Sequence, residues 1–297
     1  MNRNPPDLVY LSRIRTHAMN QYFTALINQR TSRRTFRPGK LPGHLTEAVS
    51  QLLAAHGTGP LGTLIPFRLI DRQDLDNQQL KLGTYGFIQG ARYFIAGFVA
   101  PASTAFLDYG YCLERIILEL TGLGLGTCWL GGTFDRGEFS KAMRLPENQT
   151  IPAVTPVGYP TSLRGLGDRI IRLSAGSANR LSWKNLFFEH DTGHPLDPAH
   201  SAAHHDQLEA VRLAPSASNK QPWRIFLDQG QYHFSLCRTP GYRNKFLATD
   251  LQMVDIGIAM CHWDLAGSEK GLPTRWSVSK PAGFPDEPEY IITANTD

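Results

Sequence analysis

The chain repeats part of its own sequence, and this repeat constrains the fold more than any other feature. Several residues recur with the same identity after a constant offset of 147 positions: Asp108, Gly110, Gly124, Leu125, Thr127 and Trp129 match Asp255, Gly257, Gly271, Leu272, Thr274 and Trp276. Two short stretches keep the same order, since residues 47–49 resemble 209–211 and residues 65–68 resemble 221–224. The offset is too long for a stack of small repeats. We therefore expect two copies of one domain in a single chain.

The apolar pattern predicts which elements each copy contains. Helical spacing predicts helices over residues 12–29, 45–55, 107–122, 206–213 and 251–265. Apolar runs predict strands over residues 65–70, 93–99, 151–159 and 223–227. We expect an α+β fold with the first copy in residues 12–190 and the shorter second copy in residues 200–295. Each copy should pack helices on a mixed, largely antiparallel sheet, with helices 107–122 and 251–265 in contact.

Composition narrows the class of protein. Hydrophobic residues make up 41% of the chain, charged residues 19%, and the net charge is +4, as in an ordinary globular protein. Basic residues are not gathered into one run, so we expect no nucleic-acid partner. No apolar run reaches about 18 residues and no signal-peptide core is present, which favours a cytoplasmic protein without a membrane span.

Cysteine and histidine spacing gives no metal site. The 4 cysteines include no C-x-x-C pair, so buried free thiols are expected. Histidines between residues 190 and 205 have no Cys or carboxylate at a recognised ligand spacing. We read that stretch as a solvated linker.

Residues 30–34 form a candidate phosphate site. Arg30, Ser32 and Arg34 alternate ahead of a Pro-Gly pair that stops any helix. In an extended segment alternate side chains point to one side, and two guanidiniums with a hydroxyl suit a phosphate. The alternative is a solvated basic loop.

Residues 214–223 form a second candidate site, between a predicted helix and a predicted strand. The sequence Ala-Pro-Ser-Ala-Ser-Asn-Lys-Gln-Pro-Trp carries more donors and acceptors than a turn needs. The stretch is suited to holding a polar, planar ligand. The alternative is a surface connection whose polar side chains only cap helices.

Four motifs together resemble the FMN-dependent nitroreductase family, and most closely its single-chain, duplicated TM nitroreductase branch. The loop at 214–223 resembles the loop that these flavoproteins place beside FMN. Residues 30–36 resemble the R-R-S-x-R-x-F signature, with Thr31 in place of the second Arg. Residues 124–132 resemble the G-L-G-[ST]-C-x-x-G-G stretch, and residues 254–263 resemble a run characteristic of the single-chain branch.

The resemblance implies a set of cofactor-binding residues in the first half. Arg30, Thr31 and Ser32 would hold the FMN phosphate and ribityl chain, and Arg34 would face the pyrimidine edge, where a cation stabilises anionic reduced flavin. Leu130, Gly131 and Gly132 would lie beside flavin N5, with the glycine N–H groups donating to it.

Two further first-half positions are candidates for the site. The backbone around Tyr85 could approach the ring, although residues 83–86 fit a simple turn equally well. Arg180 matches the second residue of the family's basic pair and would reach the phosphate. The first of that pair falls on Ala178, so either Arg169 or Arg172 substitutes or the phosphate is held less firmly.

The resemblance implies that the second half supplies the other wall of the site, namely Pro215, Ser216, Ser218, Asn219 and Gln221. The reciprocal elements are missing, because residues 57–62 contain no Asn or Gln and residues 188–198 contain no Arg. We therefore expect a single-chain pseudo-dimer that is monomeric, with one FMN site and one site that has been lost.

The implied activity is that of an oxidoreductase acting on small molecules. NAD(P)H would pass a hydride through flavin N5 to an electron-poor acceptor such as a nitroaromatic or quinone. The cofactor would carry the chemistry, so no catalytic acid or base is assigned. The alternative is a flavin-binding protein with little turnover, such as a sensor, carrier or degenerate paralogue.

Overall fold

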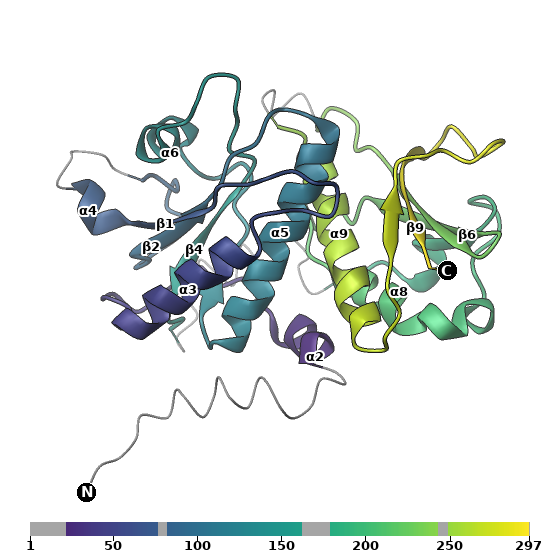
Figure 1. The fold of residues 1–297 in the computed structure, drawn as a ribbon, viewed down its shortest axis with the longest axis horizontal. Coiled ribbons are helices and arrows are strands. Elements are labelled where there is room, and N and C mark those ends of the chain that lie inside the picture. Colours follow the sequence, from purple (N-terminus) through teal and green to yellow (C-terminus); the bar gives the residue numbers. More distant parts are fainter. Residues whose placement is uncertain (1–21, 77–81, 162–178, 243–248, 297) are drawn as a thin grey trace, which may run out of the picture.

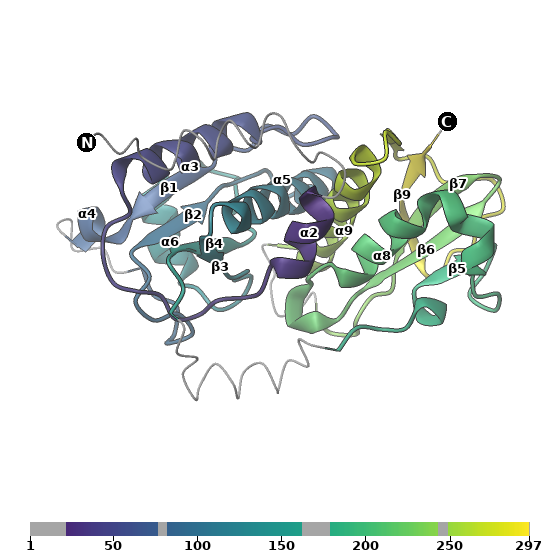
Figure 2. The same cartoon turned by 90° about the horizontal axis from the view of Figure 1, so that it is seen from below.

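The computed structural model describes residues 22–76, 82–161, 179–242 and 249–296. Two long helices, α5 (Ser103–Gly122) and α9 (Leu251–Ser268), lie side by side at the centre, and a sheet flanks them on each side (Figures 1 and 2). All but a few residues of both helices are buried, which explains their apolar sequences. The predicted contact between the two long helices is confirmed.

The first sheet has the order β1 (Arg68–Asp71), β2 (Tyr93–Ala96), β4 (Val154–Gly158), β3 (Gly126–Thr127), with every pair antiparallel. It is accompanied by the helices α3 (Gly43–Ala55), α4 (Arg72–Asp76) and α6 (Arg136–Met143). Helix α2 (Tyr22–Gln29) contacts α5, α8 and α9; the predicted residues 12–21 lie outside the described residues.

The second sheet has the order β5 (Phe187–Glu189), β6 (Trp223–Asp228), β7 (Gln231–Leu236), β9 (Glu289–Asn295), β8 (Arg275–Ser277). Strand β5 pairs in parallel with β6, and the other pairs are antiparallel. Three short 3-10 helices, η1 (Trp183–Asn185), η2 (Pro198–His204) and η3 (Ala217–Asn219), and helix α8 (His205–Leu213) complete this half.

Strand β5 belongs to the predicted first half by its position in the sequence but not by its pairing. It lies within residues 12–190, yet it hydrogen-bonds to β6 in the second sheet. The end of the first half is therefore built into the second, which local sequence patterns did not indicate.

One predicted strand is shorter than its apolar run. Strand β2 ends at Ala96, although apolar residues continue to Val99. The Tyr109 hydroxyl donates to the Ala153 carbonyl at 2.5 Å and accepts from the Gly97 N–H at 3.3 Å. Because the N–H of Gly97 bonds to a side chain, the strand does not continue.

The two central helices approach through a reciprocal pair of glycines. A Cβ on Gly110 would lie 2.1 Å from the Val254 carbonyl oxygen, and a Cβ on Gly257 would lie 2.0 Å from the Leu107 carbonyl oxygen. The offset of 147 that relates the two glycines also relates Leu107 to Val254. Each helix therefore meets the other through the same positions, the pattern of a twofold interface.

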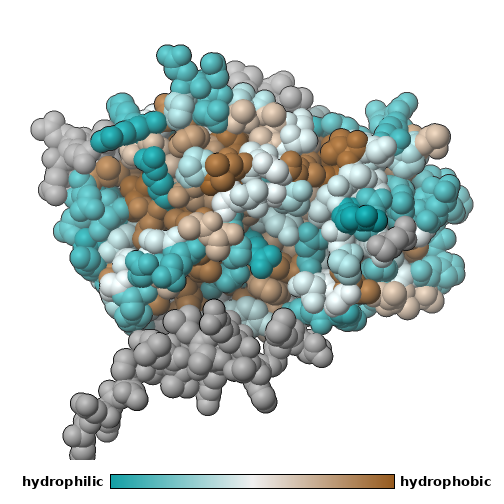
Figure 3. All heavy atoms as spheres, in the orientation of Figure 1, coloured by the Kyte–Doolittle hydropathy of each residue, from teal (hydrophilic) through white to brown (hydrophobic). Residues whose placement is uncertain are grey.

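The face seen in Figure 3 mixes hydrophilic residues with smaller apolar patches over both halves. Among the described residues, no helix is long and apolar enough to cross a membrane.

Candidate functional site

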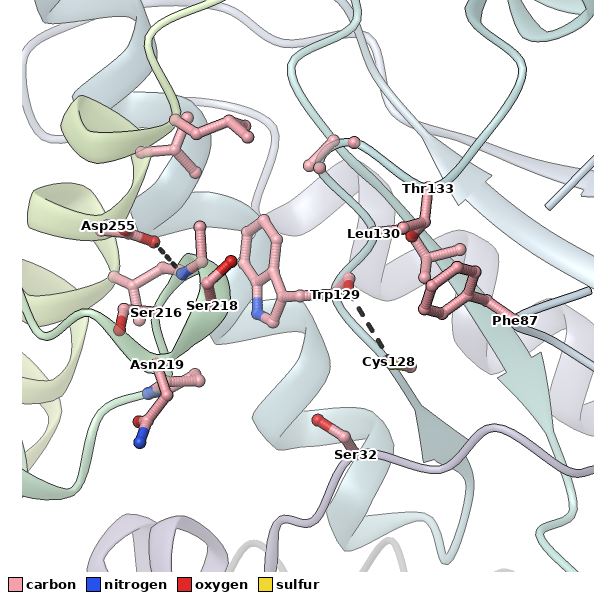
Figure 4. A pocket seen from close by; sticks show the side chains of 18 of the residues that line it. Ser32, Phe87, Cys128, Trp129, Leu130, Thr133, Ser216, Ser218, Asn219 and Asp255 are labelled. Atoms are coloured by element: carbon pink, nitrogen blue, oxygen red, sulfur yellow. Dashed lines mark hydrogen bonds between the residues drawn. The ribbon is translucent and has the colours of Figure 1, made fainter. Parts of the chain in front are cut away.

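A cavity of about 430 Å³ lies where the two halves meet. The first half contributes segment 30–34, Phe87, residues 128–133 and Ala153, and Arg180 precedes the second sheet. The second half contributes loop 215–219, Tyr242 and four residues of α9: Leu251, Val254, Asp255 and Ile258. Figure 4 shows the Trp129 indole projecting toward the loop of Ser216, Ser218 and Asn219, with Phe87 and Thr133 on the other side.

Segment 30–34 is extended, as the alternation of its residues predicts. Ser32 forms an isolated parallel β-bridge with Thr127 of β3, and the Arg33 N–H donates to the Thr127 carbonyl at 2.7 Å. Arg30, Thr31, Ser32 and Arg34 all line the cavity. The backbone pairing to β3 thus fixes the segment so that its side chains reach the cavity.

A buried arginine holds the glycine stretch after β3. The Arg136 guanidinium donates to the Gly131 carbonyl at 2.6 Å and to the Thr249 hydroxyl at 3.2 Å. Burial lowers the pKa of Arg136. A Cβ on Gly131 would lie 2.8 Å from a Leu251 methyl group, so this backbone passes close to the start of α9. Leu130, Gly131 and Gly132 line the cavity.

Loop 214–221 is held by Asp255 and has an unusual backbone. The Asp255 carboxylate accepts from the Ala217 N–H at 2.8 Å, as drawn in Figure 4. Ser218, Asn219 and Gln221 have φ values of 52°, 53° and 47°. Such left-handed conformations cost energy in residues other than glycine, and they gather at ligand-binding sites. Pro215, Ser216, Ser218 and Asn219 line the cavity.

The carboxamides of this loop bind the chain around Arg180. The Arg180 guanidinium donates to Asn219 Oδ1 at 2.9 Å and to the Leu213 carbonyl at 3.1 Å. Gln221 Oε1 accepts from the Leu181 N–H at 2.8 Å, and Asn219 Nδ2 donates to the Asn179 carbonyl at 2.8 Å. Asn219 therefore orients a cation that lines the same cavity.

Two arginines, Arg30 and Arg180, line the same cavity. Burial, and then the positive charges of Arg30 and Arg212, lower the pKa of Arg180 to about 10. Arg212 is balanced by Glu209, with a guanidinium–carboxylate distance of 2.5 Å. A bound anion would offset the remaining repulsion between Arg30 and Arg180.

The structure separates two predicted residues from the others. Tyr85 does not line the cavity: its side chain is 69% exposed, and it sits in a turn with φ 47°. Gln221 is only 3% exposed but lies behind the lining, because its amide bonds to backbone groups of residues 179–181 and 219. Ala178, Arg169 and Arg172 lie outside the described residues.

Sequence reasoning missed several lining residues. Phe87, Thr133 and Tyr242 carry no motif that marks them for a site, and Trp129 falls at an unspecified position of the 124–132 stretch. The sequence did contain a signal for Asp255, because this residue repeats Asp108 and lies in a run that resembles the single-chain branch. Within the described residues no group of His, Cys, Asp or Glu could hold a metal ion.

The equivalent region of the other half differs. Asp108 on α5 accepts from the N–H groups of Leu61 and Thr63 at 2.9 and 2.8 Å, as Asp255 does from Ala217. The cavity beside that loop is only about 210 Å³. Two of its lining residues, His56 and Arg115, pair with Glu119 at 3.0 and 3.7 Å. The acidic side chain of Glu119 thus neutralises Arg115 here.

Asparagine at position 255 should stabilise the protein at alkaline pH. Burial raises the pKa of Asp255 well above its usual value, and its Oδ2 has no partner among the described residues. Stability from this group is complete below the unfolded-state pKa and is lost as pH rises through the folded-state pKa. Asp255→Asn keeps the bond to Ala217 without that loss. In urea unfolding we expect a free energy of unfolding close to wild type at pH 3, below the unfolded-state pKa of about 3.9, and higher than wild type at pH 9 by about 1.4 kcal/mol for each unit by which folding raises the pKa of Asp255.

Asp108→Asn is the matched control for that experiment. Both Asp108 oxygens accept N–H bonds, so an amide nitrogen there leaves a buried donor facing another donor. We expect a loss of about 1–3 kcal/mol at both pH values. Identical pH slopes for wild type and Asp255→Asn would contradict the ionisation argument.

Comparison with known proteins agrees with this architecture. A family model described as "Putative TM nitroreductase" matches residues 23–267. A solved structure of a "putative nitroreductase" from Thermotoga maritima is 20% identical with a TM-score of 0.58, covering 95% of this chain and 96% of that one. A nitroreductase with bound FMN from Desulfitobacterium hafniense is 18% identical with a TM-score of 0.41, covering 48% of this chain and 91% of that one. A search of curated proteins gave no match.

Proposed function

This chain belongs to the "Putative TM nitroreductase" family, and we propose that it binds one FMN per chain and acts as an NAD(P)H-dependent oxidoreductase. The observation that carries the proposal is the pair Arg30 and Arg180, which line the same 430 Å³ cavity and whose positive charges act on each other. Two adjacent guanidiniums suit a phosphate, and the volume suits a ligand of cofactor size.

The rest of the cavity supports a flat ring system. The Trp129 indole and the side chains of Leu251 and Ile258 offer apolar walls, and Gly131 and Gly132 present backbone without side chains. Bound FMN would supply the redox chemistry, accepting a hydride from NAD(P)H and passing it to an acceptor. Gly131 and Gly132 would donate backbone hydrogen bonds to the ring.

Charged side chains would stabilise the cofactor's negative groups. Arg30 and Arg180 would hold the phosphate, with Ser32 on the ribityl chain. Arg34 would place a positive charge near the pyrimidine edge, which favours a reduced, anionic ring. Phe87 and Tyr242 would line the side left for an electron-poor acceptor such as a nitroaromatic or quinone.

The same proposal includes a single-chain pseudo-dimer that functions as a monomer in the cytoplasm. The reciprocal approach of Gly110 and Gly257 and the matching roles of Asp108 and Asp255 support a duplicated domain. The ion pairs of Glu119 in the smaller cavity support the loss of its counterpart site.

Anaerobic mixing tests the activity. Protein reconstituted with FMN should lose the visible absorbance of oxidised flavin when NADH or NADPH is added, and regain it when a quinone follows. A flavin that binds but stays oxidised would indicate a binding protein with little turnover. Titration should give one FMN per chain; two tightly bound FMN would contradict the single-site proposal.

A further inference from the structure

A buried carboxylate links both halves of the cavity without lining it. Glu114 on α5 is 0% exposed. Its Oε2 accepts from the Trp129 indole N–H at 2.6 Å, and its Oε1 lies 3.6 Å from Arg30 Nε. The same Oε1 lies 3.0 Å from Nε2 of His262 on α9. Glu114 thus contacts two cavity residues from the first half and a histidine from the second.

The contacts of His262 determine where a proton must lie. Its Nδ1 is 2.9 Å from the Ala210 carbonyl oxygen, which can only accept, so Nδ1 carries a hydrogen. A neutral imidazole of that form has a lone pair on Nε2. That lone pair would face an ionised Glu114 oxygen at 3.0 Å, which is repulsive. One proton must therefore lie between Nε2 and Oε1, either as imidazolium with carboxylate or as neutral imidazole with carboxylic acid.

This proton sets the charge near the arginines. With it, the pair of Glu114 and His262 is neutral overall, and Arg30 and Arg180 give this end of the cavity two positive charges. Without this proton, the negative charge of Glu114 beside Arg30 would lower the total charge at this end of the cavity to one positive charge. A phosphate monoester carries about −1.5 to −2 charges at neutral pH, so the protonated arrangement matches it.

The groups named next, which lie on the same helices or on α8, do not change this total charge. Cys261 is a neutral thiol, because burial and then the charge of Glu114 raise its pKa well above the usual value. Arg115 on α5 is paired with Glu119, and Arg212 on α8 is paired with Glu209.

We propose that Glu114 and His262 are positioning residues that share one proton, and that this proton keeps the phosphate end of the cavity at two positive charges. The inference rests on the proposed FMN site. Because Glu114 lies on α5 and His262 lies on α9, the proton is held only when the two helices are in contact. The contact between α5 and α9 therefore has a second role besides packing.

Three variants test the proposal by binding alone. Glu114→Gln can keep both bonds, its oxygen accepting from Trp129 and its amide donating to a neutral His262, so FMN affinity should stay within about threefold of wild type. His262→Gln removes the proton and leaves Glu114 ionised, and FMN affinity should fall by about tenfold. The double variant restores neutrality, and its affinity should return to within about threefold of wild type.

Riboflavin, which lacks the phosphate, is the matched ligand. Its affinity should be the same in wild type and His262→Gln when both ligands are titrated by fluorescence quenching. Glu119→Gln makes the same substitution as Glu114→Gln at a position of α5 that does not line the cavity, and it should leave FMN affinity unchanged. His262→Asn, which can keep the bond to Ala210, replaces His262→Gln if the latter does not fold.

The outcomes separate this inference from the proposed function. A wild-type protein that binds no FMN would overturn both. A wild type that binds FMN, with Glu114→Gln impaired as much as His262→Gln or with a double variant weaker than either, would show a purely structural role and overturn the shared-proton inference alone. Equal losses for FMN and riboflavin would also overturn it.

Discussion

Replacing Arg30 by alanine should weaken FMN binding by about 1.5–3 kcal/mol, or about 10- to 150-fold. Arg30 lines the cavity beside Arg180, and its partner Glu114 lies at 3.6 Å, beyond normal hydrogen-bond distance. Its donors can therefore turn to a phosphate at small cost. Isothermal titration of the variant with FMN measures the effect.

Arg37→Ala is the appropriate control for Arg30→Ala. Arg37 lies on the same segment but is exposed and does not line the cavity. Its loss should leave FMN affinity within about twofold of wild type, because exposed charges are screened by salt. Unchanged affinity in Arg30→Ala would mean that the phosphate lies elsewhere.

The second large effect concerns stability, since Gly257→Ala should cost about 3 kcal/mol or more of unfolding free energy. A methyl group there would lie 2.0 Å from the Leu107 carbonyl oxygen, and backbone on a buried helix cannot move aside cheaply. The helices must separate, and the cavity formed across them must change with them. We therefore expect weaker FMN binding as well as a lower midpoint in urea unfolding.

Gly110 occupies the equivalent position on α5, so substituting it checks the prediction for Gly257→Ala. Gly110→Ala places a methyl group 2.1 Å from the Val254 carbonyl oxygen and should destabilise the protein to a similar extent. Gly43→Ala, at the start of α3 with no atom within 4 Å of the new methyl group, should be close to neutral. Wild-type stability in Gly257→Ala would contradict the close approach of α5 and α9.

Several features of this protein could be read from sequence because they depend on local spacing. The alternation of Arg30, Ser32 and Arg34 predicted an extended segment with these side chains together, and all three line the cavity. The helical periodicity of residues 107–122 and 251–265 predicted two long buried helices. Their shared offset of 147 indicated that they would play the same role.

Other features depend on which distant groups happen to meet, and local patterns say nothing about them. Gln221 belongs to the motif that includes Asn219, yet only Asn219 lines the cavity, because the amide of Gln221 bonds to the backbone of residues 179 and 181. Strand β5 belongs to the first half in sequence and to the second sheet in space. For Tyr85 the local pattern left two interpretations open, an approach to the ligand and a simple turn, and the structure has the exposed turn.

The sequence by itself determined the family, the elements and most of the side chains that reach the cavity, because helical period, strand alternation and motif spacing are properties of neighbouring residues. Only the tertiary structure decided that Asn219 orients Arg180, that Asp255 holds the loop, and that Glu114 meets His262. These contacts join residues 38 to 148 positions apart in the chain. They form because two glycines let α5 and α9 approach until side chains of both halves share one buried space.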